Sequence, residues 1–156
     1  EGDVYEEILT ICERENIRSG VVLNIVGGLR RARLSLPMVA TSVDAQPGVL
    51  ELEGMMEAQG IGTIGWNIDG YDASSRSGIV YRPGTPNLHI HMTITHAGKT
   101  YMGHLIEGCV VRSVHPKSHF TIVLAKTDGA QLNFRVSKET NAHYPNGIPI
   151  HDLVQE

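Results

Sequence analysis

The sequence has few cysteines, few aromatic residues and no long apolar run. Its two cysteines, Cys12 and Cys109, are too few for a disulfide framework, so we expect a reducing, cytoplasmic setting. No apolar stretch approaches the roughly 18–20 residues that a membrane helix requires. The acidic start Glu1-Gly2-Asp3 is not followed by a signal-peptide pattern. These absences argue against a disulfide-stapled secreted domain and a helical membrane protein, and we expect no membrane partner.

Positive charge is also scarce. Thirteen Lys and Arg against seventeen Asp and Glu give a formal net charge of −4, whereas a non-specific DNA binder usually presents a basic face. The composition therefore disfavours a stand-alone DNA-binding domain. The one arginine cluster is Arg30-Arg31-Ala32-Arg33. On a strand, Arg31 and Arg33 share one face and Arg30 takes the other, and we interpret the cluster as a solvated strand edge.

The residue pattern predicts one α+β domain over residues 1–156, built on a largely antiparallel β-sheet with one N-terminal helix. Asp3 to Glu15 carries an apolar stripe at helical spacing, with Asp3 as its N-cap and Cys12 as a core residue. Beyond this helix, apolar residues recur at every second position, which is the alternation of a β-strand. The alternation predicts strands at residues 20–26, 29–36, 49–56, 87–95, 100–111, 120–125 and 132–136.

Other segments interrupt this strand pattern. Gly27-Gly28 separates the first two predicted strands, and Pro37 ends the second. The segment 57–86, above all residues 60–86, is rich in Gly, Ser, Asp and Pro and predicts mostly a long loop or a functional insertion, with a short strand within it as the alternative. The polar tail 137–156 predicts turns and a surface segment, which leaves a core of about residues 1–136.

Histidine is abundant, and three of the eight histidines fall into one pattern. In the run 88–95, strand alternation puts His89 and His91 on the same face. If the next turn is centred on Ala97-Gly98, paired positions sum to 96 + 99 = 195, and His91 pairs with His104. Directly opposed residues point to the same face with Cβ atoms about 4.5–5.5 Å apart. A slip of one residue would turn His104 to the other face.

Three neutral imidazoles plus water form a catalytic type of zinc site. The pattern thus predicts that His89, His91 and His104 bind zinc or another divalent transition metal, and a set of ordinary surface histidines is the alternative interpretation. The remaining five histidines have no such pattern, and we interpret them as surface residues: His96, His115, His119, His143 and His151.

These residues also carry a family resemblance. The run Pro86-Asn87-Leu88-His89-Ile90-His91, then Gly98, Gly103-His104-Leu105 and Gly108-Cys109-Val110-Val111 resembles the plant and prokaryote conserved (PPC) domain. That family typically shows P-x-L-H-x-H, a D-G type turn, G-G-H-L and G-x-V. The segment 49–55 and Phe134-Arg135 fit as well, so the resemblance covers roughly residues 1–136. Met102, Glu53 and the His96-Ala97-Gly98 turn depart from the family pattern.

The resemblance implies an α+β fold that usually assembles as a homotrimer. In plants the domain follows an AT-hook, and prokaryotic members are often described as DNA-binding by analogy. No R-G-R-P type hook occurs here, so nucleic acid is the least favoured partner. Our first hypothesis is therefore a trimeric PPC-type binding or regulatory module with a three-histidine metal site.

A second hypothesis is an enzyme. The PPC fold is similar to that of acetolactate decarboxylase, a zinc enzyme with an H-x-H strand and a third downstream histidine. This similarity implies a metal-dependent reaction on a small carbonyl or carboxylate compound. Glu53 and Glu107 are candidate acid/base partners and Arg112 a candidate anion anchor, although ordinary surface charge explains each of them too. The sequence assigns none of the three a catalytic role.

Overall fold

The fold begins with a capped amphipathic helix. The computed structural model describes residues 2–40, 45–112, 120–141 and 144–155. Helix α1 spans Val4–Arg14, and the Asp3 carboxylate accepts hydrogen bonds from the backbone N–H groups of Tyr5 and Glu6. Such a cap contributes about 1 kcal/mol. Val4, Ile8 and Cys12 are buried on one face of the helix, as the helical spacing predicts.

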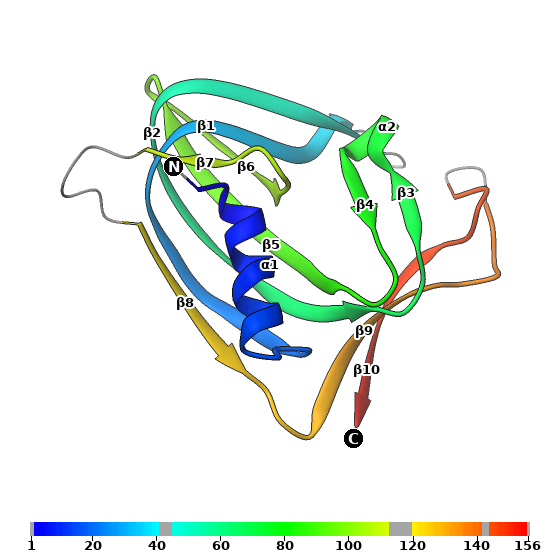
Figure 1. Ribbon diagram of the computed structural model, residues 1–156. Helices are drawn as coiled ribbons and strands as arrows, with labels where there is room; N and C mark the ends of the chain where they lie inside the picture. The colour runs from blue at the N-terminus through cyan, green and yellow to red at the C-terminus, as the bar shows by residue number, and fades with distance from the viewer. Residues whose placement is uncertain (1, 41–44, 113–119, 142–143, 156) are drawn as a thin grey trace.

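Most of the chain forms one sheet, in which two long strands organise the others (Figure 1). The strands are β1 (Gly20–Ala40), β2 (Ala45–Asn67), β5 (Pro86–His96), β6 (Lys99–Leu105), β7 (Val110–Val111), β8 (Phe120–Lys126), β9 (Ala130–Val136) and β10 (Pro149–Gln155). β1 pairs with β2, β6, β7 and β8, while β2 also pairs with β5 and β9. Because β5 pairs with β6 and β1 with β2, strands β2, β5, β6 and β1 close into a circuit.

Every pairing between described strands is antiparallel except the short one between β2 and β9. This arrangement confirms the predicted α+β class with a largely antiparallel sheet. The core lies between α1 and the concave side of the sheet, where α1 crosses β5 (Figure 1). Ile90, Met92 and Ile94 of β5 are fully buried there, while His89 and His91 face the other way.

Two predicted interruptions were wrong. Gly27-Gly28 does not break the first strand, since both glycines stay paired with Ala58 and Glu57 of β2. Pro37 does not end it either, because β1 continues to Ala40. The predicted strand 100–111 is instead divided into β6 and β7, with Gly108 at a positive φ of 116° between them.

The prediction of a long loop at 57–86 was also wrong in its first part. Residues 57–67 complete β2. Beyond them lie β3 (Tyr71–Ala73), the short helix α2 (Ser74–Ser77) and β4 (Ile79–Tyr81), and β3 and β4 form a separate small sheet. The tail 137–156 is likewise more ordered than predicted, because Pro149–Gln155 forms β10 beside β9. No helix among the described residues is both long and apolar enough to cross a bilayer.

Candidate metal centre

The β5–β6 hairpin brings His91 and His104 together. The register pairs His96 with Lys99 and His91 with His104. This confirms the pairing predicted for a turn centred on Ala97-Gly98. The turn between them works because Ala97 and Gly98 both adopt positive φ, at 49° and 76°. Positive φ at both central residues defines the tight turn whose twist matches antiparallel strands. The turn therefore sets which face His104 takes.

The three predicted histidines converge through the same ring nitrogen. The Nε2 atoms are 3.3 Å apart for His89 and His91, 3.2 Å for His89 and His104, and 3.1 Å for His91 and His104. Among the described residues these three form the group of potential ligands whose donor atoms lie within 4.8 Å of one another. The predicted triangle is thus present as a side-chain arrangement.

Its dimensions match the needs of a small divalent ion. Zinc binds imidazole nitrogen at about 2.0–2.1 Å. The edge of a tetrahedron is 1.63 times its centre-to-vertex distance, so three nitrogens on zinc lie about 3.3–3.4 Å apart. Octahedral ligands at the same bond length lie about 2.8–3.0 Å apart. The observed 3.1–3.3 Å falls between the two, nearer the tetrahedral value.

Hydrogen bonding alone cannot satisfy this triangle. Each Nε2 of a neutral imidazole offers either one N–H or one lone pair in the ring plane. Each Nε2 here has two others within 3.3 Å, so it cannot make two good hydrogen bonds at once. A cation at the centre would accept all three lone pairs. The donor set therefore fits a transition-metal ion.

The electrostatic setting keeps the rings of His89 and His104 neutral. Burial, followed by the neighbouring rings of His104, His151 and His91, lowers the pKa of His89 to about 4. Burial and His91 also lower the pKa of His104 below its ordinary value. Only the neutral imidazole can coordinate a metal. At neutral pH, His89 and His104 are thus in the form that binds.

One further histidine lies beside the cluster and was missed by the sequence interpretation. His151 comes from β10, where it pairs with Phe134 of β9. Its ring centroid lies 5.2 Å from that of His89 and 5.6 Å from that of Phe134. No local motif marks His151, and the polar tail gave no strand signal from which its position could be found.

The one remaining described histidine is not part of this cluster. His96 lies at the hairpin turn, where its Nδ1 is 3.2 Å from the carbonyl oxygen of Met55. His115, His119 and His143 lie outside the described residues.

The candidate acidic and basic partners lie mostly elsewhere. Glu53 of β2 lies opposite Arg31 of β1 in the strand register, and it lines a hollow together with Asp3. The Arg112 side chain lies against Gly28. Neither Glu53 nor Arg112 lines either of the two hollows that border the histidine cluster. Glu107 does, because it borders a cavity that also contains His89 and His104.

The histidine cluster lies between two hollows of different character. An open hollow of about 790 Å³ borders His89 and His91 and carries the exposed apolar side chains Leu23, Ile61 and Met102. We call it the apolar hollow. A more enclosed cavity of about 400 Å³ borders His89, His104 and His151 together with residues of α1 and β4. We call it the polar cavity. Each hollow therefore borders two of the three clustered histidines.

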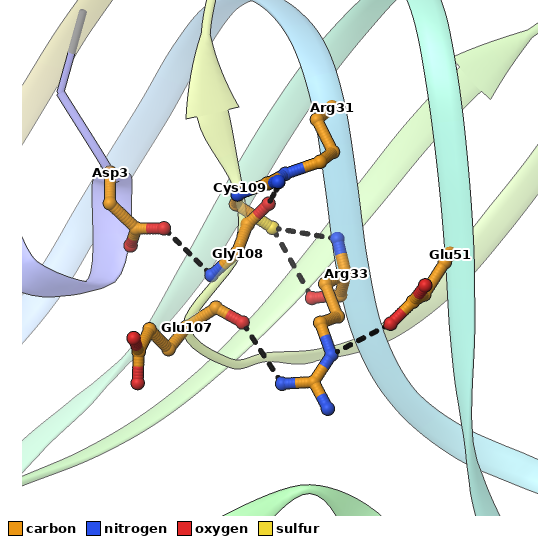
Figure 2. A network of polar contacts seen from close by, with 7 residues as sticks. All are labelled: Asp3, Arg31, Arg33, Glu51, Glu107, Gly108 and Cys109. Atoms are coloured by element: carbon orange, nitrogen blue, oxygen red, sulfur yellow. Dashed lines mark hydrogen bonds and ion pairs between the residues drawn. The ribbon is translucent and has the colours of Figure 1, made fainter.

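The arginine cluster has structural partners rather than a free basic surface (Figure 2). Arg33 Nε donates to the Glu51 carboxylate at 3.1 Å, and Arg33 Nη1 donates to the Glu107 carbonyl at 3.3 Å. Arg31 Nε donates to the Gly108 carbonyl at 3.2 Å. These contacts tie β1 to the 107–109 turn. The interpretation as a solvated edge is corrected to this extent, since Arg31 and Arg33 lie in a strand paired on both sides.

The 107–109 turn has a buried thiol at its centre. The Cys109 Sγ lies 3.3 Å from both the backbone N–H and the carbonyl oxygen of Arg33 (Figure 2). The Gly108 N–H donates to Asp3 Oδ2 at 2.7 Å, so the helix cap and the turn share one carboxylate. Burial raises the pKa of Cys109 to about 11, and the thiol is free. Its surroundings are those of a structural cysteine.

Solved structures of known proteins share this fold. A plant- and prokaryote-conserved protein from Pyrococcus horikoshii matches with a TM-score of 0.63 at 19% identity, covering 94% of this chain and 82% of the other. A "putative DNA-binding protein" from Ralstonia eutropha JMP134 matches with a TM-score of 0.62 at 16% identity, covering 96% and 84%. A metal-containing protein from Archaeoglobus fulgidus matches with a TM-score of 0.59 at 16% identity, covering 96% and 84%.

At these identities the structural matches establish the fold alone. No curated protein matches the chain in sequence. The family comparison is more specific, since the model of the Plants and Prokaryotes Conserved (PCC) domain matches residues 1–115. That range includes α1, the β5–β6 hairpin and all three clustered histidines. Together with the fold, it shows that the chain belongs to the plants and prokaryotes conserved domain family.

Proposed function

We propose that the protein is a metal-binding module that holds one zinc or similar divalent transition-metal ion through His89, His91 and His104. The observation that carries this proposal is the triangle of Nε2 atoms at 3.1–3.3 Å. When bound, such an ion supplies a Lewis acid with at least one coordination position open to a small ligand. The metal-containing neighbour from Archaeoglobus fulgidus supports the proposal by analogy.

Metal analysis of the purified protein tests this proposal. The intact chain, loaded with zinc and desalted, is expected to retain about one ion per chain, and His91→Ala or His104→Ala to lose it. His96→Ala is the matched control, because His96 contacts the Met55 carbonyl rather than the cluster. Equal metal content in all four proteins would contradict the site.

We further propose that the module works as a homotrimer, with the apolar hollow as part of the subunit contact. Leu23, Ile61 and Met102 are 55%, 64% and 60% exposed in the single chain. Three large apolar side chains around one hollow are typical of a protein contact surface. In light scattering, the trimer would show three times the 17.0 kDa chain mass. Ile61→Glu combined with Met102→Glu is expected to give monomer, while Leu153→Glu on β10 leaves the mass unchanged.

DNA association is the weaker part of the family analogy. Two of the structural neighbours are described as "putative" DNA-binding proteins. This chain, however, has a net charge of −4, and its Arg31 and Arg33 already have protein partners. We propose a binding or regulatory role that does not depend on direct DNA contact. A mobility-shift titration of random duplex DNA at physiological salt is expected to show no complex. A salt-dependent shift would contradict this expectation.

A second candidate function is a metal-dependent enzyme. The observation that favours it is the polar cavity of about 400 Å³ beside His89 and His104, with Glu107 on its wall. Such a site would act on a small carbonyl or carboxylate compound polarised by the ion. Turnover in a panel of small keto and hydroxy acids, lost in His91→Ala, would distinguish the enzyme from a binding module.

A further inference from the structure

The polar cavity contains hydrogen-bond donors that the fold does not use. It lies between α1, β4, β10 and the histidine cluster, and its volume is in the lower part of the range of about 300–1,000 Å³ found for ligand sites. Tyr5 from α1 and Tyr81 from β4 both line it. Neither phenol oxygen has a hydrogen-bond partner within the described part of the chain.

Packing explains the tyrosine rings but not their hydroxyls. The Tyr81 ring stacks on Phe134 with centroids 4.0 Å apart, and the Tyr5 ring packs against the core. Phenylalanine would serve equally well for both contacts. Burial raises the pKa of Tyr5 to about 12 and also raises that of Tyr81. Both hydroxyls therefore remain protonated and available as donors.

Two nitrogen-bearing side chains complete the donor set. Arg82 lines the cavity, and its guanidinium lies close enough to Tyr5 and Glu6 to act on the pKa of both, in the lowering direction. It forms no ion pair with any described residue. His151 lines the same cavity beside His89 but is not one of the three converging ligands. Its ring nitrogens likewise have no hydrogen-bond partner among the described residues.

The charge balance of the wall restricts the ligand. Arg82 contributes one positive charge, while Glu6, Glu13 and Glu107 contribute three negative ones. With a divalent ion on the histidines the sum is 1 − 3 + 2 = 0. Such a wall offers one cationic side chain and the metal to a single carboxylate, and it has no surplus positive charge to balance a polyanion such as a nucleotide. The three glutamates also offer acceptors for hydroxyl groups of a ligand.

We propose that the polar cavity binds a small monocarboxylate bearing hydroxyl groups, with one ligand oxygen on the metal and the remainder held by Tyr5, Tyr81 and Arg82. His151 acts as a positioning residue that hydrogen-bonds the ligand oxygen nearest the metal. This inference rests on the proposed metal site and assigns it a class of ligand. It also gives a role to the C-terminal strand β10, which lies outside the family match to residues 1–115.

The test uses the intact protein loaded with Co²⁺, whose visible spectrum reports ligands at the metal. Titration with D-glycerate is expected to change the spectrum and to saturate. Tyr5→Phe and Tyr81→Phe each remove one hydroxyl and should weaken glycerate binding roughly threefold to tenfold. Arg82→Gln should weaken it more than tenfold, because a charge-assisted bond is lost. His151→Ala should weaken it roughly threefold to tenfold.

Matched controls separate the cavity from the metal. Tyr101→Phe, Arg14→Gln and His96→Ala lie outside the polar cavity and should bind glycerate like the unaltered protein. Thiocyanate reports the open metal position alone, so its affinity should be the same in Tyr5→Phe, Tyr81→Phe and Arg82→Gln. Inorganic phosphate, as a multiply charged anion, should compete poorly with glycerate.

The outcomes distinguish the two proposals. If the unaltered protein gives no Co²⁺ spectrum, the metal site itself is contradicted. If it loads Co²⁺ and binds thiocyanate but does not respond to glycerate, the cavity proposal is overturned. Equal glycerate affinity in the cavity variants and the controls would overturn it as well. Tighter thiocyanate binding in His151→Ala would show that His151 competes for the metal, which contradicts its positioning role.

Discussion

His91 and His104 stand opposite each other across the β5–β6 hairpin, with their Nε2 atoms 3.1 Å apart. The distance between these two nitrogens depends on a turn six residues from either of them, because antiparallel pairing fixes every opposed pair once the turn is set. His89 joins from the same strand face, two residues before His91. The relative positions of all three histidines therefore depend on the register of the β5–β6 hairpin.

Metal binding is expected to stabilise the folded chain. An ion that binds only the folded state, at a free concentration one hundred times its Kd, adds about 2.7 kcal/mol. For a chain of this size that raises the Tm by about 5–10 °C. Differential scanning calorimetry with zinc and with a chelator checks this. His91→Ala should abolish the zinc-dependent shift, and a shift of equal size in that variant would show that zinc binds elsewhere.

The metal-free protein is expected to lose stability in mild acid. The pKa of His89 is about 4 in the folded chain and near 6.5 in the unfolded chain, so between these values the unfolded state binds more protons. Stability is then fully present above about pH 6.5 and falls as the pH drops towards 4. The lowered pKa of His104 acts in the same direction.

Urea unfolding in chelator at pH 7.5, 6 and 5 measures this dependence. His89→Asn removes one titrating group from the cluster, so its free energy of unfolding should depend less steeply on pH. His96→Asn provides the comparison at a histidine outside the cluster. An unchanged pH dependence in His89→Asn would mean that this ring does not couple folding to protonation.

The β5–β6 hairpin turn contains one strained residue, Ala97, whose replacement should relieve the strain. Ala97 adopts a φ of 49°, a left-handed conformation that costs a residue with a Cβ about 1–2 kcal/mol. Asn tolerates this region and precedes Gly in the most favoured two-residue turns. Ala97→Asn should therefore stabilise the protein by about 1 kcal/mol and leave metal binding intact. Thr100→Asn, in the strand beyond the turn, should give no gain in a parallel thermal unfolding experiment.

Much of the site could be predicted because its geometry is local. Strand alternation and one hairpin relate His89, His91 and His104, and both rules act over fewer than twenty residues. His151 could not be found in this way. It reaches His89 through a chain of pairings from β10 to β9, from β9 to β2 and from β2 to β5, which depends on the whole sheet. Ile150 and Leu153 in β10 are exposed, so the strand has no buried apolar alternation to reveal it.

The glycines of β2 misled the sequence interpretation for a different physical reason. The run Gly60-Ile61-Gly62-Thr63-Ile64-Gly65 has the composition of a loop, yet it pairs with β5 throughout. Glycine serves here for close approach rather than for flexibility. A Cβ on Gly60 would lie 2.5 Å from the Met92 sulfur, and one on Gly65 would lie 2.5 Å from the Leu132 carbonyl oxygen. Composition alone cannot separate these two uses of glycine.

Gly62 on β2 pairs with Ile90, the residue between His89 and His91 on β5. Its replacement tests this explanation. A Cβ on Gly62 would lie 2.3 Å from the His89 carbonyl oxygen and 2.6 Å from the Ile90 Cα. Both are backbone atoms, so no side-chain rotation relieves the clash and β5 must move. Gly62→Ala should therefore destabilise the protein by about 2–3 kcal/mol and weaken zinc binding, although it alters no ligand.

Gly84→Ala is the matched control, because positive φ there costs about 1 kcal/mol but a Cβ meets nothing within 4 Å. It should lower the Tm modestly and leave zinc affinity unchanged. If both variants bound zinc like the unaltered protein, contact between β2 and β5 would not be what positions His89.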